Sequence, residues 1–436
     1  MQYATNTLEH QWMPFTGNRD FKAEPRLIVR GEGVYYWNHK GEKMLDGSSG
    51  LFCCAAGHGR KEIADAVAKQ LMEVEFTPHF QMGHPSSFEL ASRIAKLTPE
   101  GLNRVFFTNS GSEAVDTALK IAMAYHRARK DGQRIRFVSR ERAYHGVNIG
   151  GTSLSGMVKN RETFSGVMPG VVHMRHTWDA KQTFVQGQPD NGADLADDLQ
   201  RICENVGGST IAACFVEPIA GSTGCLVPPK GYLERLREIC DAHGILLVFD
   251  EVITGFGRTG APFAAQAFGV TPDLMTMAKA ITNGCQPMGA IAVKDEIYET
   301  IIDAAPENAI ELFHGYTYSS HPAACAAGVA VQKIYDAENT FEKAAGLVDH
   351  FQKALYSLEG LDCLADIRGF GMIGAVELKP KGNPGALGTQ FQKDLFWRGL
   401  HVKFTGDCGV VAPAFVADKS DIDAMIGLLR EALEEL

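Results

Sequence analysis

The sequence predicts an α/β protein in which helices cover a mostly parallel sheet, with a smaller α+β domain formed by the ends of the chain. Three observations support this fold: the length of 436 residues, the alternation of short apolar runs with helical patterns, and a change of pattern after Pro322. A chain of this length usually exceeds one compact core. We therefore expect an N-terminal segment over residues 1–55, a large domain over 56–320 and a small domain over 321–436, with the N-terminal segment packing against the small domain or a partner chain.

Helical and strand patterns alternate through the large domain. Apolar residues repeat at helical spacing over residues 63–74 and 90–97, which predicts two helices. Short apolar runs then predict strands at residues 105–108, 135–138, 211–216, 245–249, 274–278 and 289–293. Strands that are hydrophobic on both faces and alternate with helices are typical of a parallel sheet between two helical layers. In the last domain, two helices precede a strand over residues 372–378, and a final helix is capped near Ser420.

The charge of the chain favours small molecules as partners. The formal net charge is −10 at pH 7, whereas nucleic acids and anionic membranes are bound by clustered Lys and Arg. The start MQYATNTLEHQW lacks the basic and apolar regions of a secretion signal, and no run reaches the roughly 20 apolar residues of a spanning helix. We expect a cytoplasmic protein that binds neither nucleic acid nor membrane.

The cysteines predict no zinc or disulfide framework. Ten cysteines are scattered along the chain, and no pair has C-x-x-C spacing. Reduced and mostly buried thiols are expected, with no metal site. The adjacent Cys53 and Cys54 leave metal or redox chemistry open at that point, although packing is the favoured interpretation.

A phosphate site is predicted where the first strand ends, because ligands collect at the carboxyl ends of parallel strands. The strand is followed by Asn109-Ser-Gly-Ser-Glu-Ala114, which leads into a long helix. Small residues at a helix start leave N–H groups free and suit an anion. The simpler alternative is that Ser112 only caps the helix, with Glu113 placed favourably in its first turn.

A lysine and an aspartate end two other predicted strands. Lys279 follows the run Leu274-Met-Thr-Met-Ala, and Asp250 follows Ile245-Leu-Leu-Val-Phe. A desolvated lysine amine becomes a nucleophile, although a lysine that reaches the surface, or a plain salt bridge, would explain either residue alone. Together with a phosphate site, the pair forms the minimal apparatus for pyridoxal phosphate: an anchor, a partner for the ring nitrogen and an aldehyde trap.

The stretch Ile245–Gly260, ILLVFDEVITGFGRTG, also contains the G-x-G-x-x-G pattern of dinucleotide-binding turns. A single match to this pattern is weak, and here two acids separate it from the apolar run. We interpret GFGRTG as a loop beyond the strand, and keep an NAD-dependent oxidoreductase as a remote alternative. Tyr144, after another predicted strand, is either a cofactor contact or part of the core.

Nine ordered stretches carry a resemblance to a known family: HQWMPFT, SGLF, NSGSEA, YHGVNI, VEPIAGS, LLVFDEVITGFGR, DLMTMAKAITNG, HGYTYSSHP and GDCGVVAP. Over essentially its whole length, the sequence strongly resembles the class III, fold-type I pyridoxal-phosphate aminotransferases. Within that family it is similar to the branch of β-alanine or ω-amino acid–pyruvate aminotransferases.

The resemblance implies a role for each matching residue. It makes Lys279 the Schiff-base lysine and catalytic base, and it assigns to the cofactor site Gly111 and Ser112 at the phosphate, Tyr144 and Val252 on the two ring faces, Glu217 as a nearby acid, Asp250 at the ring nitrogen, and Thr317 at the phosphate of the neighbouring subunit. A residue shared between subunits implies a homodimer, and a tetramer is equally compatible.

The implied reaction moves an amino group from an ω-amino acid or primary amine to a ketoacid, with pyruvate giving alanine. Decarboxylases and aminomutases use the same fold and cofactor residues, so they remain alternatives. A non-catalytic binding protein is disfavoured by the intact lysine, acid and phosphate stretches.

Three positions depart from the branch. Phe52 stands where many members have tryptophan, Lys403 where they have a carboxylate-binding arginine, and Val410 where β-alanine-type members tend to have a polar residue. The ornithine and γ-aminobutyrate types have an arginine near this position, so these two substrate classes are disfavoured. Lysine replaces a rigid bidentate fork with a point charge. We expect an apolar substrate pocket lined by Phe52, Phe80, Tyr144, Ala220 and Tyr316 of the partner subunit. The alternative is that Lys403 points to solvent or holds the same carboxylate less tightly.

Overall fold

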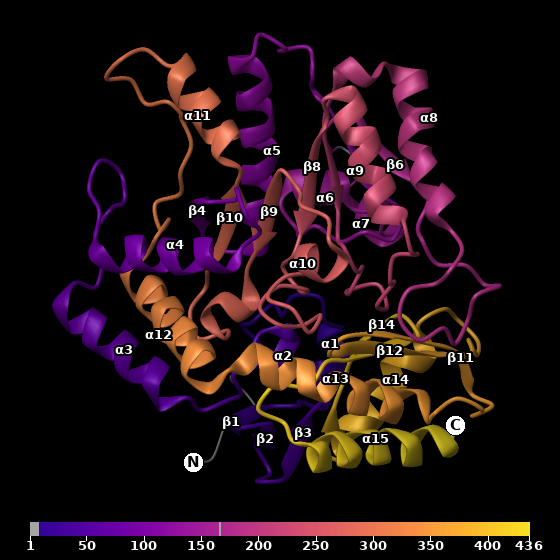
Figure 1. The fold of residues 1–436 in the computed structure, drawn as a ribbon. Helices are drawn as coiled ribbons and strands as arrows, with labels where there is room; N and C mark the ends of the chain where they lie inside the picture. The colour runs from indigo at the N-terminus through magenta and orange to yellow at the C-terminus, as the bar shows by residue number, and fades with distance from the viewer. Residues whose placement is uncertain (1–7, 165–166) are drawn as a thin grey trace.

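The computed structural model describes residues 8–164 and 167–436, and in this part of the chain the strands form three sheets. The central sheet and its helices occupy the upper part of Figure 1, and the elements from both ends of the chain lie below it. No helix among the described residues combines the length and hydrophobicity that crossing a bilayer requires.

The central sheet has seven strands in the order β4-β10-β9-β8-β7-β5-β6. Their bounds are Arg104–Thr108 (β4), Gly289–Val293 (β10), Leu274–Met277 (β9), Leu246–Asp250 (β8), Ile211–Val216 (β7), Arg136–Arg140 (β5) and Val171–Met174 (β6). All neighbours run parallel except that β10 is antiparallel to both β4 and β9. The expected sheet is therefore confirmed as mostly parallel. Strand β6, only partly buried, carried too weak an apolar signal to be predicted.

Helices cover both faces of this sheet, as the doubly apolar strands predict. On one face α5 (Gly111–Ala128) packs with α6 (Ile149–Leu154) and α11 (Asp295–Ala304), and Phe215 points into this layer. On the other face α8 (Asp197–Val206) and α9 (Tyr232–His243) form a core with the neighbouring Cys214 and Val216. Alternate residues of one strand thus enter opposite cores. Shorter elements complete the domain: α7 (Val158–Thr163), α10 (Ala264–Phe268), η2 (Ala193–Ala196), η3 (Gly208–Thr210) and η4 (Lys279–Thr282).

Three longer helices flank the edge of the sheet beside β4. They are α3 (Lys61–Glu73), α4 (Pro85–Leu97) and α12 (Pro322–Glu338), and α12 packs against both of the others. The two helices predicted before the first strand are confirmed with slightly earlier starts.

The C-terminal elements form an antiparallel sheet covered by helices. The sheet has the order β11-β12-β15-β14. Its strands are Leu364–Phe370 (β11), Ile373–Leu378 (β12), Lys403–Thr405 (β14) and Cys408–Val411 (β15), and the helices are Thr340–Tyr356 (α13), Ala386–Trp397 (α14) and Lys419–Glu434 (α15). The final helix is capped near Ser420 as predicted, and the cap is Asp418, whose carboxylate accepts a 2.9 Å hydrogen bond from the Asp421 amide.

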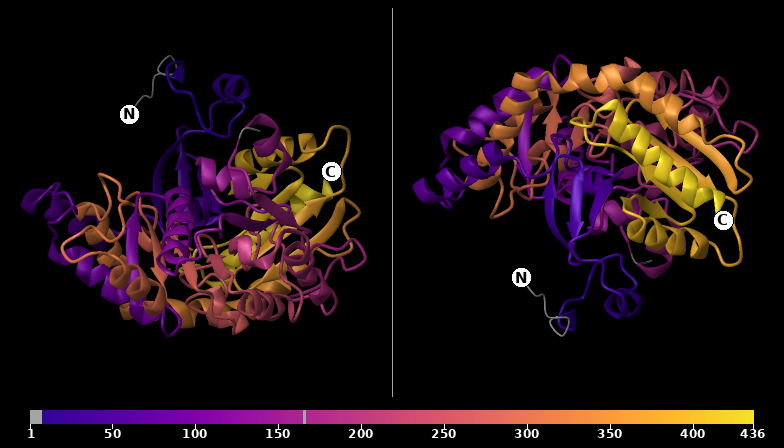
Figure 2. Two further views of the ribbon diagram at one scale, coloured as in Figure 1. Left: turned by 90° about the horizontal axis from the view of Figure 1, so that it is seen from above. Right: turned by 90° about the horizontal axis from the view of Figure 1, so that it is seen from below.

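The N-terminal residues join the C-terminal part of the chain. Strands β1 (Ile28–Glu32), β2 (Tyr35–Asn38) and β3 (Lys43–Asp46) form a sheet that β13 (Leu400–His401) completes by pairing in parallel with β3. Helix α2 (Ser49–Phe52) follows, and the segment around α1 (Asn18–Ala23) projects beyond the sheets in both views of Figure 2. The domain limits at residues 55 and 320 stay predictions.

Candidate active site

Lys279 begins the short helix η4 and is separated from the end of β9 by one residue. Its side chain is partly buried, and its Nζ lies 5.3 Å from the centre of the Phe52 ring. Desolvation lowers the pKa of this amine, although negative charge on Cys53, Asp250 and Glu217 acts in the opposite direction. Desolvation therefore favours the neutral, nucleophilic form of Lys279.

Asp250 is held in a fixed orientation at the end of β8. Its carboxylate lies 2.8 Å from His145 Nδ1 and accepts 3.2 Å hydrogen bonds from the Thr276 hydroxyl and the Val252 amide. Asp250 is 6% exposed and His145 1% exposed. Sequence reasoning assigned no role to His145. The available signal was its place beside Tyr144 after a predicted strand.

The start of α5 lies against the residue that precedes Lys279. A Cβ added to Gly111 would lie 3.0 Å from a Val252 methyl and 3.5 Å from the Ala278 Cβ, so only glycine leaves this approach open. Within residues 8–164 and 167–436, the Gly111 and Ser112 amides donate to no protein acceptor. Two free helix-start amides thus converge beside Lys279, as an anion site requires.

The interpretation of Ser112 as the cap of α5 is wrong. The cap is Ser110, whose hydroxyl accepts a 3.2 Å hydrogen bond from the Glu113 amide. The Ser112 hydroxyl instead accepts a 3.1 Å hydrogen bond from the Val147 amide. Ser112 therefore joins α5 to the loop after β5, which carries Tyr144.

Tyr144 and Glu217 meet at the ends of β5 and β7. The Tyr144 amide donates a 3.0 Å hydrogen bond to the Glu217 carboxylate, and Arg140 donates to the Glu217 backbone carbonyl at 2.8 Å. Burial raises the pKa of Glu217 to about 7, so this acid is partly neutral near neutral pH. The loop after β5 is thereby tied to the adjacent strand end.

An apolar wall adjoins Lys279. Phe52 is 3% exposed and belongs to a buried cluster with Ile219, Ile253 and Val410. Ala220, also buried, directly follows Ile219. The departures at Phe52 and Val410 therefore fall in one apolar cluster, with Phe52 itself facing the lysine.

Phe80, Tyr316 and Thr317 form a second group. A Cβ added to Gly315 would lie 2.8 Å from the Phe80 ring, and the Tyr316 hydroxyl lies 3.3 Å from Thr117 Oγ1. Thr317 and Phe80 are exposed. None of these contacts reaches Lys279 of the same chain, so the structure does not assemble these three predicted residues with the lysine.

Lys403 lies on the far side of the turn that carries Phe52. Its amide donates a 2.9 Å hydrogen bond to the Ser48 hydroxyl, while its Nζ donates to the Phe404 carbonyl at 2.6 Å. The side chain lines a hollow of about 810 Å³ between the N-terminal segment and α14. Burial lowers the pKa of this amine. Lys403 thus points into a hollow bounded by protein rather than freely to solvent.

The glycines of GFGRTG do not bind a dinucleotide. A Cβ added to Gly257 would lie 2.8 Å from the Phe415 ring, so this loop packs against the C-terminal residues. The next helix, α10, offers no free amides at its start, because Glu251 accepts 2.8 and 2.7 Å hydrogen bonds from the Ala264 and Ala265 amides. The dinucleotide alternative is therefore contradicted, and GFGRTG is a loop that packs against residues from the C-terminal part of the chain.

All ten cysteines are free thiols. Six are buried, as expected for packing. In the described part of the chain, no group of three or more His, Cys, Asp or Glu side chains could hold a metal ion.

The geometry of the site indicates a class of enzyme. A partly desolvated lysine, a buried carboxylate oriented by histidine, and free helix-start amides meet at the carboxyl edge of an α/β sheet, which is the arrangement of an enzyme that uses an anionic carbonyl cofactor. The family model Aminotransferase class-III matches residues 17–433, and the chain belongs to this family.

Individual relatives are similar along nearly their whole length. An omega-aminotransferase of Caulobacter vibrioides is 50% identical over 100% of this chain and 99% of its own. An omega-amino acid–pyruvate aminotransferase of Pseudomonas putida is 48% identical over 98% of this chain and 96% of its own. The omega transaminase of Pseudomonas jessenii, solved in complex with PMP, is 31% identical with a TM-score of 0.93, covering 99% of this chain and 97% of that chain.

Class-III aminotransferases depend on pyridoxal phosphate, and the residues of this chain fit that cofactor. The free amides of Gly111 and Ser112 match its phosphate, and the close approach of Gly111 to Val252 leaves no space for another side chain. Asp250 offers a fixed carboxylate of the kind that the ring nitrogen requires, and Lys279 offers an amine of the kind that the aldehyde requires.

Proposed function

We propose that this aminotransferase moves an amino group from an ω-amino acid or a primary amine to a ketoacid, with pyruvate as acceptor and alanine as product. The names of the relatives, an omega-aminotransferase and an omega-amino acid–pyruvate aminotransferase, support the donor class and the acceptor. The observation that carries the chemistry is the convergence of Lys279, the Asp250–His145 pair and the start of α5 at one sheet edge.

Each residue has a distinct task in the proposed site. When bound, pyridoxal phosphate supplies an aldehyde that takes up the amine and a ring that withdraws electrons from the substrate carbon. Gly111 and Ser112 hold the phosphate with backbone amides. Asp250, oriented by His145 and Thr276, keeps a proton on the ring nitrogen. Tyr144 and Val252 flank the ring.

Lys279 moves the proton in both half-reactions. Once the donor amine displaces it, the neutral Lys279 Nζ removes the proton from the carbon that bears the amino group. The same Nζ would return that proton on the cofactor side, and water would supply the oxygen of the carbonyl product. The ketoacid acceptor reverses these steps. Desolvation supports this role, because it increases the neutral fraction of the amine.

The wall beside Lys279 supports a preference for large or uncharged amines. Phe52 and Val410 share a buried apolar cluster with Ile219 and Ile253. The Nζ of Lys403 is engaged by the Phe404 carbonyl, which leaves a small carboxylated donor without the rigid arginine fork of the branch.

Rates of the first half-reaction with β-alanine and with an arylalkyl amine test this preference. We expect the arylalkyl amine to react about tenfold faster, since burying its ring against Phe52 adds apolar contact that β-alanine lacks. Stopped-flow absorbance of the bound cofactor measures both rates, and alanine formed from added pyruvate reports complete turnover. Faster reaction of β-alanine would remove the preference, and product without any need for a ketoacid would indicate a decarboxylase or an aminomutase.

We further propose a homodimer with shared active sites. Phe80, Phe313 and Tyr318 are exposed beside Thr317, and Phe313 reaches 91% exposure. Trp12, on the projecting N-terminal segment, is also 91% exposed. Large exposed apolar side chains gathered in this way mark interaction surfaces. A second copy would cover them and bring Thr317 and Tyr316 to the neighbouring site.

Sedimentation velocity checks the homodimer. We expect a species of twice the chain mass, or four times for a tetramer, at micromolar concentration. The Phe313→Glu variant should shift the distribution toward monomer, because a charge replaces an apolar side chain at the interface. The control Tyr298→Glu changes an exposed aromatic residue on α11. A monomeric wild-type enzyme with full activity would contradict the shared site.

A further inference from the structure

The Phe52 loop, defined as residues 46–58, connects β3 to α3 and has an unusual backbone. Ser49, Gly50 and Phe52 have φ angles of +46°, +70° and +63°. Non-glycine residues rarely adopt this left-handed region, so two of the three conformations persist only because the surroundings impose them. The position of Phe52, whose ring faces Lys279 Nζ at 5.3 Å, therefore depends on what holds this loop.

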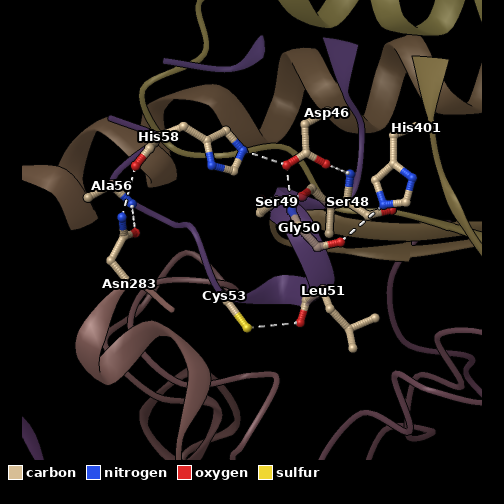
Figure 3. A network of polar contacts seen from close by, with 12 residues as sticks. Asp46, Ser48, Ser49, Gly50, Leu51, Cys53, Ala56, His58, Asn283 and His401 are labelled. Atoms are coloured by element: carbon tan, nitrogen blue, oxygen red, sulfur yellow. Dashed lines mark hydrogen bonds and ion pairs between the residues drawn. The ribbon is translucent and has the colours of Figure 1, made fainter. Parts of the chain in front are cut away.

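One buried carboxylate joins the two ends of the loop. Asp46 is 1% exposed, and it accepts hydrogen bonds from the Ser48 amide at 3.1 Å and from the Gly50 amide. The same carboxylate lies 2.8 Å from His58 Nε2, at the other end of the loop (Figure 3). Asp46 thus fixes the tight turn before Phe52 and the exit of the loop at the same time.

His58 is itself held in place. Its ring packs against Tyr36, with ring centres 4.2 Å apart, and its backbone pairs with Gly33 through hydrogen bonds of 2.8 and 3.1 Å. Strand β2 and the turn before it therefore fix the imidazole that faces Asp46. The pair Asp46–His58 is anchored to the N-terminal sheet rather than to the loop alone.

The remaining contacts tie the loop to the lysine and to the C-terminal sheet. Asn283, at the end of the helix that Lys279 begins, accepts from the Ala56 amide at 2.9 Å and donates to the Gly57 carbonyl at 2.8 Å. On the other side, the Ser49 hydroxyl donates to the Ala412 carbonyl at 2.6 Å. Figure 3 shows Asn283 beside Ala56, and Asp46 beside Ser48 and Gly50.

We propose that Asp46 and His58 are positioning residues that set the place of the Phe52 ring over Lys279 and thereby select the size of the amine donor. This inference rests on the proposed amine–ketoacid transamination. Neither residue touches the reacting atoms. They act through the backbone of Ser48–Phe52, whose left-handed conformations relax when the carboxylate no longer accepts the Ser48 and Gly50 amides.

The Asp46→Asn variant tests this role, because one amide oxygen replaces two accepting oxygens with little change in volume. Asp198→Asn is the matched control: Asp198 is also buried and accepts three hydrogen bonds from Arg175, at 2.8 to 2.9 Å, far along the chain on α8. A second pair, His58→Phe and His58→Gln, separates the hydrogen bond from ring packing. Phenylalanine keeps the ring beside Tyr36, and glutamine keeps an N–H that can reach Asp46.

Two measurements on the holoenzymes decide the proposal. The first is the ratio of half-reaction rates for an arylalkyl amine and β-alanine. We expect Asp46→Asn and His58→Phe to change this ratio about tenfold, because the pocket wall moves. Asp198→Asn should leave the ratio within about twofold of the wild type. The ratio of His58→Gln should lie between those of the wild type and His58→Phe. The second is hydrogen–deuterium exchange of peptides spanning residues 46–58, which should accelerate in Asp46→Asn and His58→Phe but not in Asp198→Asn.

Unchanged exchange in both Asp46→Asn and His58→Phe would overturn the proposal, as would faster exchange with an unchanged donor ratio. If Asp46→Asn does not fold, the His58 pair gives the same decision. A wild-type enzyme that transfers no amino group to a ketoacid would overturn the proposed function and the donor selection built on it. In that case the exchange data still show whether Asp46 and His58 hold the loop.

Discussion

Replacing Lys279 with alanine is expected to lower transamination at least about 10⁴-fold, because the enzyme loses both its covalent attachment to the cofactor aldehyde and its proton carrier. The effect should appear in the first half-reaction as well as in alanine formation. Borohydride reduction followed by peptide mass analysis should place the cofactor on the peptide that contains Lys279 in the wild type, and on no peptide in the variant.

The matched control is Lys294→Ala. Both lysines come just after a strand, Lys294 after β10 and Lys279 after β9. Because β10 runs antiparallel to β9, Lys294 lies at the opposite edge of the sheet. There its Nζ lies 2.7 Å from the Asp273 carboxylate. We expect this variant to keep wild-type turnover. A Lys279→Ala enzyme within about tenfold of the wild type, or a label on another lysine, would contradict the assigned role.

Replacing Asp250 with asparagine is expected to lower the half-reaction rate about 10³-fold, because a neutral amide no longer stabilises the protonated ring nitrogen. Thr276 and Val252 can still donate to the remaining oxygen, so the fold should persist. Stopped-flow rates at saturating donor measure the loss, and added cofactor should not restore it.

Glu251→Gln is the control for Asp250→Asn, because the two acids are adjacent and both buried. Glu251 accepts from the Thr254 hydroxyl at 2.6 Å and from the amides that begin α10, so its loss should affect stability. We expect a decrease of about 1–3 kcal/mol in the free energy of unfolding, measured by denaturation, with the half-reaction nearly unchanged. Equal rate losses in both variants would contradict separate roles for the acids.

The sequence predicted most of the fold because its signals are local. The structure forms strands at all six apolar runs predicted in this part of the chain, within two residues of their expected bounds. Burial on both faces selects the same residue types along the whole run. Strands β1, β2 and β6 were not predicted, because they are partly exposed. Strand β13 was not predicted either, because its pairing with β3 joins segments far apart in the chain.

The candidate site was predicted in part for the same reason. Lys279 and Asp250 are charged residues at the ends of apolar runs, where charged residues are uncommon. This signal can be read from the sequence alone. His145 was not predicted, because its importance is a 2.8 Å contact with a residue 105 positions away. The cap of α5 was misplaced by two residues, since several small polar residues there were equally suitable.

By itself, the sequence determined which segments are buried and which charged side chains lie at their ends. Hydrophobic pattern and residue type are local properties that do not depend on distant contacts. Only the tertiary structure decided the direction of β10, which places Lys294 at the opposite edge of the sheet from Lys279. Only the tertiary structure also brought Phe52 to face Lys279. It also gave the two adjacent acids different partners, and separated Phe80, Tyr316 and Thr317 from the lysine of their own chain. These outcomes depend on pairing between segments far apart in the chain, which no local pattern encodes.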